Sequence, residues 1–178
     1  MQSHCINLGD AMTSSDAPEL DGVHHVKLPV SDLNRSRAWY EGRLGYQVAT
    51  EFTEDGALTG LALVHPRGGP MLALRLDPDL AARAAGFDYF SIGVPTKAAI
   101  EALARRLAAL GEQHAGVHFA TIGWILPGTH DPDGHEVRFY TTAHHTDPRA
   151  EEIGQVNDAV ATAAAREQAY LASQGEQA

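Results

Sequence analysis

The sequence contains a single cysteine, Cys5, so a disulfide within the chain and a cysteine-based metal cage are both excluded. It also lacks any apolar run near the roughly 18 residues that a bilayer-crossing helix needs. No basic start is followed by a hydrophobic stretch, as a secretory leader would require. We therefore expect a cytoplasmic protein without a membrane anchor, whose chemistry depends on residues other than cysteine.

Basic residues are scarce. The chain has 13 Lys and Arg against 23 Asp and Glu, a formal net charge of −10, and no block of basic residues interrupts the acidic background. Such a charge repels a phosphate backbone, which argues against nucleic acid as a partner. With 178 residues, 44% of them hydrophobic, the chain has room for one well-buried domain and two dispensable ends.

The two ends differ from the middle in pattern. Residues 1–20 are polar and without periodicity, which predicts a flexible N-terminal extension before a domain over residues 21–143. Residues 146–173 carry Ile153, Val156 and Val160 among alanines at helical spacing, which predicts an amphipathic C-terminal helix. That helix could pack on its own domain or contact a partner subunit.

The first half of the domain reads as one strand, one helix and three strands. Val26, Leu28 and Val30 alternate with other residues, as in a half-buried strand. Ser31 and Asp32 then cap a helix that ends at Gly45. Three further strands are predicted, separated by turn-forming segments, over residues 47–53, 58–65 and 70–76.

The same order repeats in the second half. A strand over residues 89–94 precedes a helix capped by Thr96, and Leu44-Gly45-Tyr46-Gln47 returns 66 positions later as Leu110-Gly111-Glu112-Gln113. Strands are again predicted after the helix, over residues 117–120, 123–127 and 134–141. The repeat predicts two copies of a βαβββ unit, over residues 22–77 and 86–142.

Three segments together resemble the vicinal-oxygen-chelate superfamily of glyoxalase, bleomycin-resistance and extradiol dioxygenase type. They are His24-His25-Val26-Lys27-Leu28-Pro29-Val30-Ser31-Asp32-Leu33, Trp39-Tyr40 through Leu44-Gly45-Tyr46, and Asp131-Pro132-Asp133-Gly134-His135-Glu136-Val137-Arg138-Phe139-Tyr140. The resemblance implies an α+β fold in which two tandem modules form a curved mixed-sheet cup for a ligand. Members of the family include enzymes and drug-sequestering proteins, so the fold does not decide the function.

Strand parity predicts which side chains face the cup, because successive residues of a strand point to opposite faces. The apolar set should pack under the helices: Val26, Leu28, Leu72, Leu74, Phe90, Ile92, Val137 and Phe139. The alternate set should face the cup: His25, Lys27, Met71, Ala73, Arg75, Tyr89, Ser91, Glu136, Arg138 and Tyr140. A register slip of one residue would exchange the two sets.

The resemblance also implies where a divalent metal would bind in metal-dependent relatives. The four positions correspond to His25, Ala73, Tyr89 and Arg138. Ala73 offers no donor atom and Arg138 carries a permanent positive charge, so we expect no metal cofactor. The alternative is a rearranged site in which His25 and Glu136 hold Fe, Mn, Ni or Zn.

Several of these residues also have an ordinary structural interpretation. His25 could hydrogen-bond to a neighbouring strand, Arg138 and Glu136 could neutralise each other, and Tyr89, Tyr140 and Met71 could be filling. Trp39 is expected in the core, and the sequence does not decide the face of Trp124. Other histidines are expected at strand ends or loops, as exposed groups or rim contacts: His65, His118 and His130.

Two functions follow. The first is a metal-free binder of a planar or partly anionic molecule, similar to the antibiotic-sequestering branch of the family. The second is a metal-dependent lyase, isomerase or dioxygenase acting on vicinal oxygens, in which Glu136 moves a proton. Metal-free acid-base catalysis by His25, Tyr89 and Glu136 is a variant of the second. The resemblance also implies a homodimer, with or without exchange of modules between subunits.

Overall fold

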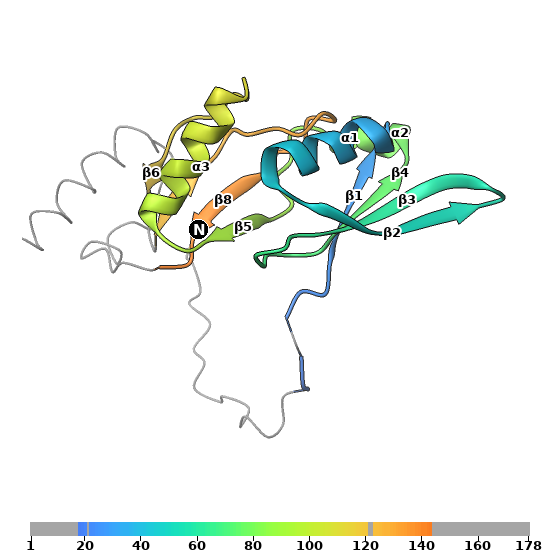
Figure 1. The fold of residues 1–178 in the computed structure, drawn as a ribbon, viewed down its shortest axis with the longest axis horizontal. Helices are drawn as coiled ribbons and strands as arrows, with labels where there is room; N and C mark the ends of the chain where they lie inside the picture. Colours follow the sequence, from blue (N-terminus) through green and yellow to red (C-terminus); the bar gives the residue numbers. More distant parts are fainter. Residues whose placement is uncertain (1–17, 21, 121–122, 144–178) are drawn as a thin grey trace, which may run out of the picture.

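A computed structural model describes residues 18–20, 22–120 and 123–143 of the chain (Figure 1). The predicted N-terminal extension lies outside these residues except for its last three. The predicted C-terminal helix over residues 146–173 lies outside them entirely. No helix of the described residues is long and apolar enough to cross a membrane.

The first half of the chain forms the predicted βαβββ module, here called module one. Its elements are β1 (Val26–Val30), α1 (Leu33–Trp39), the π-helical turn η1 (Tyr40–Leu44), β2 (Gln47–Glu54), β3 (Ala57–Val64) and β4 (Leu72–Leu76). The strands form one mixed sheet in the order β1-β4-β3-β2, in which β1 runs parallel to β4 and the other pairs are antiparallel.

Local interactions explain where the first helix begins and ends. The Asp32 side chain accepts hydrogen bonds from the backbone N–H groups of Asn34 and Arg35, at 2.9 and 3.0 Å, and so caps α1 as predicted. Gly45 ends the helical segment with φ of 82°, a left-handed conformation that glycine adopts without steric penalty. The last turn, η1, is π-helical rather than α-helical, which the sequence did not predict.

Module two repeats this arrangement. Its elements are β5 (Ser91–Val94), α3 (Lys97–Ala109), β6 (His118–Phe119), β7 (Trp124–Leu126) and β8 (Arg138–Thr141), and its sheet has the order β5-β8-β7-β6. Thr96 caps α3 by accepting a hydrogen bond from the Ala99 backbone at 3.2 Å. The residue after the helix end, Gly111, has φ of 83°. The repeat predicted from the sequence is therefore confirmed.

Two segments differ from the prediction. The linker between modules contains a short helix, α2 (Pro78–Ala84), capped by Asp77 and begun by Pro78, both ordinary helix-start residues. The final strand begins at Arg138 rather than at Gly134, because Asp131 and the following residues form a hydrogen-bonded turn. Only an isolated bridge, between His130 and Glu136, precedes it.

The two helices α1 and α3 lie on the same side of their sheets (Figure 1). The side chains predicted to face them are buried, at 9% exposure or less, for all members except the half-buried Val26 and Phe90. Trp39 is in the core, as expected. Trp124 is also buried, with its ring near Phe119 and beneath the Lys97 ammonium, 3.8 Å from the ring centre. The predicted strand phase is therefore confirmed.

No strand pairing joins the two sheets within the described part of the chain. The modules meet at two places: Arg43 and Arg106 bond between η1 and the α3 end of module two, and the turn before β8 packs on β1 and α1. Asp133 accepts hydrogen bonds from the hydroxyls of Ser31 and Ser36, and Arg35 lies 2.8 Å from it. These residues of module one hold a side chain that stands about 100 positions later in the chain.

A second carboxylate of the same turn is buried more deeply. Asp131 accepts a hydrogen bond from the Tyr40 hydroxyl at 3.0 Å and from the backbone N–H groups of Asp133 and His135. Its pKa is raised, mainly by burial, although these hydrogen bonds act in the other direction. Burial and the nearby carboxylate also raise the pKa of Tyr40 well above its usual range.

His135 completes this contact between the modules. Its ring is buried and its Nε2 atom donates a hydrogen bond to the Pro29 carbonyl of β1 at 2.7 Å. We call the residues that join the modules here the inter-module cluster. Its members are Ser31, Ser36, Tyr40, Asp131, Asp133 and His135.

Candidate ligand-binding site

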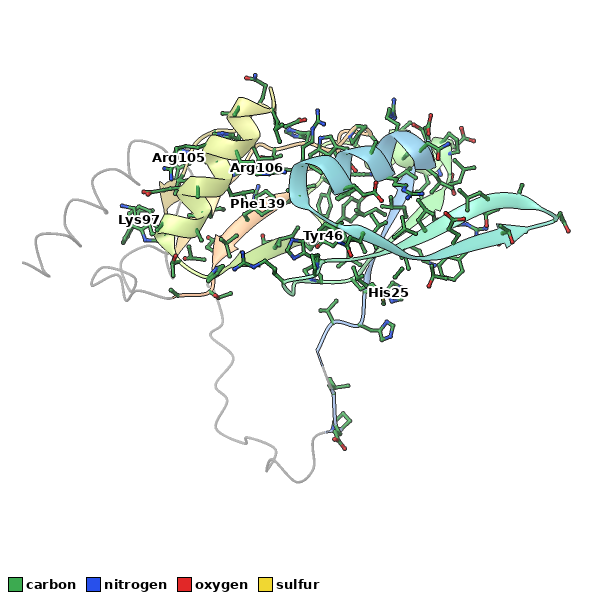
Figure 2. All side chains as sticks on the ribbon, in the orientation of Figure 1. His25, Tyr46, Lys97, Arg105, Arg106 and Phe139 are labelled. Atoms are coloured by element: carbon green, nitrogen blue, oxygen red, sulfur yellow. The ribbon has the colours of Figure 1, made fainter. Side chains whose placement is uncertain are left out.

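The face of the first sheet opposite α1 carries a depression of about 240 Å³. Its polar residues come from β2, β4, β1 and the residue before β1, which is His25, shown on this side in Figure 2. The lining residues are His25, Lys27, Phe52, Glu54, Gly60, Leu61, Ala73, Leu74 and Arg75. Lys27 lies beside Ala73 in the parallel ladder, and Arg75 beside Gly60 and Pro29, so the register brings them to one surface.

The two cations of this depression differ in their surroundings. Arg75 forms an ion pair with Glu54, with 2.8 Å between Nη1 and Oε1, and this contact lowers the pKa of Glu54. Lys27 is exposed, and within the described residues no side chain forms an ion pair or hydrogen bond with its ammonium group. Lys27 is thus available to a ligand, whereas Arg75 is already paired.

The open face of the second sheet carries the predicted residues of module two. Ser91 pairs with Arg138 in the parallel ladder, and Tyr140 pairs with Ile125, which in turn pairs with His118. Residues directly opposite each other in a sheet point to the same side. Arg138, Tyr140, Ile125 and His118 therefore share the face away from α3.

Arg138 is held between two carboxylates. Its Nε and Nη2 atoms each lie 3.1 Å from a different oxygen of Glu136, and its Nη1 atom lies 2.7 Å from Asp88. Burial alone would raise the pKa of Glu136, but the hydrogen bonds from Arg138 and from the Gly128 backbone lower it. The predicted pairing of Arg138 with Glu136 is present, and Asp88 adds a partner that the sequence did not reveal.

Two predicted residues lie at the edges of these faces. Tyr89 precedes β5, and its ring contacts Phe87 and His135, with centroid distances of 5.0 and 5.5 Å. Met71 precedes β4, and its carbonyl accepts a hydrogen bond from the Val26 backbone. Neither residue lines the depression on module one.

The four positions implied for a metal do not supply a suitable donor set. Ala73 has no donor atom, and the Arg138 guanidinium occupies Glu136 and Asp88, the nearby carboxylates. The ring of His25 lies against that of His24, with 2.9 Å between their Nδ1 atoms. Among the described residues no three His, Cys, Asp or Glu side chains converge as metal ligands. These residues do not fit the divalent metal of metal-dependent relatives.

Sequence reasoning missed several residues on these faces. Phe52 and Glu54 lie on β2. Nearly every residue of this strand is exposed, so apolar and polar residues do not alternate in a way that indicates which side chains face the depression. The usable signal was Gly60, a glycine inside a strand, which often marks close approach of a neighbour. An added Cβ there would lie 3.0 Å from the Leu74 carbonyl and 3.6 Å from the Phe52 ring.

The comparisons with known proteins agree on one family. Residues 22–139, about two thirds of the chain, match the Glyoxalase/Bleomycin resistance protein/Dioxygenase superfamily. No protein with a curated function matches the sequence.

Solved structures share the fold. One is a glyoxylase/bleomycin resistance protein/dioxygenase domain from Frankia sp. EAN1pec, with 25% identity, a TM-score of 0.56, and coverage of 69% of this chain and 98% of that one. A lactoylglutathione lyase from Agrobacterium tumefaciens has 20% identity and a TM-score of 0.56, with coverage of 71% and 97%.

A third structure is TnmS3, an antibiotic binding protein from Streptomyces sp. CB03234, with 17% identity and a TM-score of 0.56. The match covers 70% of this chain and 98% of that one. Family match, repeated modules and sheet topology lead to one conclusion: the chain belongs to the glyoxalase/bleomycin resistance protein/dioxygenase superfamily.

Proposed function

We propose that this protein binds a small organic molecule without a metal ion, in the manner of the antibiotic-binding members of its family. The observation that carries the proposal is Arg138, a guanidinium bound by Glu136 and Asp88 at a position where metal-dependent relatives place a ligand. A metal ion could bind these two carboxylates only by displacing the guanidinium that already pairs with both of them.

The chemistry of the faces defines the ligand class. Phe52 is half exposed and offers a ring for stacking, while Lys27 supplies a cation that pairs with no carboxylate among the described residues. Ser91 and Tyr140 add hydroxyl groups on the other sheet. A planar molecule with one acidic or carbonyl group satisfies these surfaces through stacking and a few directed polar contacts.

We further propose that two chains form a homodimer, in the cytoplasm, to complete the site. The depression on module one measures about 240 Å³, below the roughly 300–1,000 Å³ of sites that enclose a drug-sized ligand. A second wall is therefore required. The open face of module two could supply that wall, because it carries the Ser91 and Tyr140 hydroxyl groups. The strands β1 and β5 are edge strands of their sheets, so each has one side open to a second chain.

Calorimetry with naphthalene-2-carboxylate tests the binding proposal. Lys27→Ala should weaken binding by roughly tenfold, since a hydrogen bond to a charged group contributes about 1.5–3 kcal/mol. Arg138→Ala should weaken it by a similar factor, because it leaves the Glu136 and Asp88 carboxylates without their cation, and these then repel an anionic ligand. Arg105→Ala is the control. Arg105 lies on α3, away from both faces (Figure 2), so this substitution removes one positive charge without altering either face. Unchanged affinity in both site variants would contradict the proposal.

Metal analysis separates this proposal from the enzymatic alternative. Protein purified without chelator should carry no stoichiometric Fe, Mn, Ni or Zn. The contrary result is a near-stoichiometric metal that disappears in His25→Ala, and it would favour a metal-dependent lyase, isomerase or dioxygenase.

A further inference from the structure

A larger cavity, of about 470 Å³, lies between the modules on the helix side of the sheets, away from the faces described above. Tyr46 and Phe139, which line it, lie in the region between α1 and α3 in Figure 2. We call it the inter-module cavity. It shares no lining residue with the depression on module one, so the two are separate sites.

One wall of the inter-module cavity is apolar. Module two supplies it from β5, α3 and β8, and the strand residues Ile92, Val94 and Phe139 are buried. Ala99 and Leu103 of α3 are half-buried and complete this wall. An apolar group that enters here leaves water at a gain of about 25 cal/mol per Å².

The opposite wall comes from module one and is polar. It includes His65, Arg67 and Tyr46, and the His65 and Tyr46 rings meet edge to face with 5.4 Å between their centroids. The Tyr46 hydroxyl donates to the Pro70 carbonyl and is thereby engaged. The Arg67 backbone donates to His65, but no hydrogen bond or ion pair within the described residues engages the Arg67 guanidinium.

The loop that presents Arg67 is shaped by two glycines. Gly68 and Gly69 have φ of 94° and 109°, a region that other residues rarely adopt, and both line the cavity. A Cβ at Gly69 would lie 3.7 Å from the Tyr46 hydroxyl. The loop thus turns sharply at the mouth without placing side chains there.

We propose that the inter-module cavity binds an organic carboxylate with an apolar body. Its volume lies within the roughly 300–1,000 Å³ typical of small-molecule sites. Its two walls match the two parts of such a ligand. Module two offers buried hydrocarbon, and module one offers the Arg67 guanidinium, which pairs with no side chain in the part of the chain that the structure describes. Guanidinium binds carboxylate through two parallel hydrogen bonds, which makes Arg67 the anchor.

Calorimetry on the full chain with octanoate, and with octanamide as its neutral counterpart, tests this site. Octanoate should bind at one molecule per chain, and more tightly than octanamide. Arg67→Ala should weaken octanoate binding by roughly tenfold and leave octanamide unchanged, because only the charged hydrogen bonds are lost. Arg67 is exposed, so this variant should fold normally.

Cavity-filling variants provide a second measurement. Leu103→Trp and Ala99→Phe should both abolish binding of octanoate and octanamide, with unfolding temperatures measured to establish that each variant folds. Lys27→Ala, which alters the other site, should change neither affinity. Octanoate binding that is lost in Lys27→Ala and retained in Arg67→Ala would place the ligand in the depression on module one and overturn the proposal. Absence of octanoate binding to the full chain would overturn it as well.

Discussion

Tyr40 and Tyr46 are neighbouring buried tyrosines whose hydroxyl groups donate to different kinds of acceptor. Tyr40 donates to the Asp131 carboxylate at 3.0 Å, and Tyr46 donates to the Pro70 carbonyl at 3.1 Å. Burial raises the pKa of Tyr46 to about 12, and burial together with the Asp131 carboxylate raises the pKa of Tyr40 well above its usual value, so both remain protonated donors at neutral pH. The pair therefore compares a charged acceptor with a neutral one at similar distance.

Tyr40→Phe should lower the free energy of unfolding by about 1.5–3 kcal/mol, because a buried carboxylate loses one of its donors. Tyr46→Phe should lower it by only about 1 kcal/mol. Urea unfolding of both variants at pH 7 measures the two values. Equal losses would show that the inter-module cluster gains nothing from the charge of Asp131.

Asp133 gives the inter-module cluster a dependence on pH. Burial raises the pKa of this carboxyl, but hydrogen bonds from Ser31 and Ser36 and the charge of Arg35 outweigh it, so the net shift is downward. A lowered pKa means that the folded state favours the ionised form. The stabilisation that Asp133 contributes is therefore fully present above its unfolded-state pKa of about 3.9, and it is lost as the pH falls through its folded-state pKa.

Asp133→Asn should accordingly reduce stability by roughly 1–2 kcal/mol at pH 7, of which the half-exposed Arg35 contributes little. The difference from the natural protein should shrink as the pH falls below about 4. Asp131, whose pKa shifts upward, is present in both proteins, so its contribution to the pH dependence of stability is common to both. Denaturant midpoints measured across this range provide the test, and a gap that does not depend on pH would contradict it.

At the scale of single elements, the two helices end at equivalent glycines. Gly45 and Gly111 have φ of 82° and 83°, and Gly42, inside η1, has an ordinary helical conformation with open space around it. Gly45→Ala and Gly111→Ala should each destabilise the protein by about 1 kcal/mol, because alanine is strained at positive φ. Thermal unfolding of the three single variants provides the measurement.

Gly42→Ala is the matched control. Alanine there should stabilise the protein by about 0.5–1 kcal/mol, since it lowers the entropy of the unfolded chain without a clash. If all three substitutions destabilise equally, the conformation at Gly45 and Gly111 is not the reason for those glycines.

Most of the fold was predictable because its signals are local and occur twice. The helix caps Asp32 and Thr96 and the repeated Leu-Gly pair fixed both helices, and alternation in β1, β4 and β5 fixed which side chains are buried. The linker helix α2 carried equally local signals, Asp77 and Pro78, and could have been predicted from them.

The candidate site was harder to predict because it depends on register between distant strands. Phe52 reaches the depression through pairing with Gly60, and Asp88 reaches Arg138 from outside any strand. The role of Asp131 and Asp133 was also not visible: the sequence identified a turn, whereas the structure places both carboxylates against module one. No local pattern encodes these contacts.

At the scale of the whole molecule, mixing two variants tests how the proposed dimer assembles. Lys27 lies on module one and Arg138 on module two. If each site combines modules of two chains, a mixed dimer of Lys27→Ala and Arg138→Ala chains contains one intact site. If each site uses one chain, it contains none.

We expect unfolding and refolding of the two variants together to restore high-affinity binding of naphthalene-2-carboxylate to a fraction of the sites. Calorimetry on the mixture and on each variant alone measures that fraction. A mixture that binds no better than either variant would exclude exchange of modules between chains.

The inter-module cluster also affects how the chain folds during synthesis. Ser31 and Asp133, which bond to each other, are separated by 102 positions. When a ribosome has released only the first half of the protein, Ser31, Ser36 and Tyr40 still lack the carboxylates that they contact in the finished protein. The nascent N-terminal half should therefore remain sensitive to protease until the turn before β8 emerges, and it then becomes resistant together with the second half.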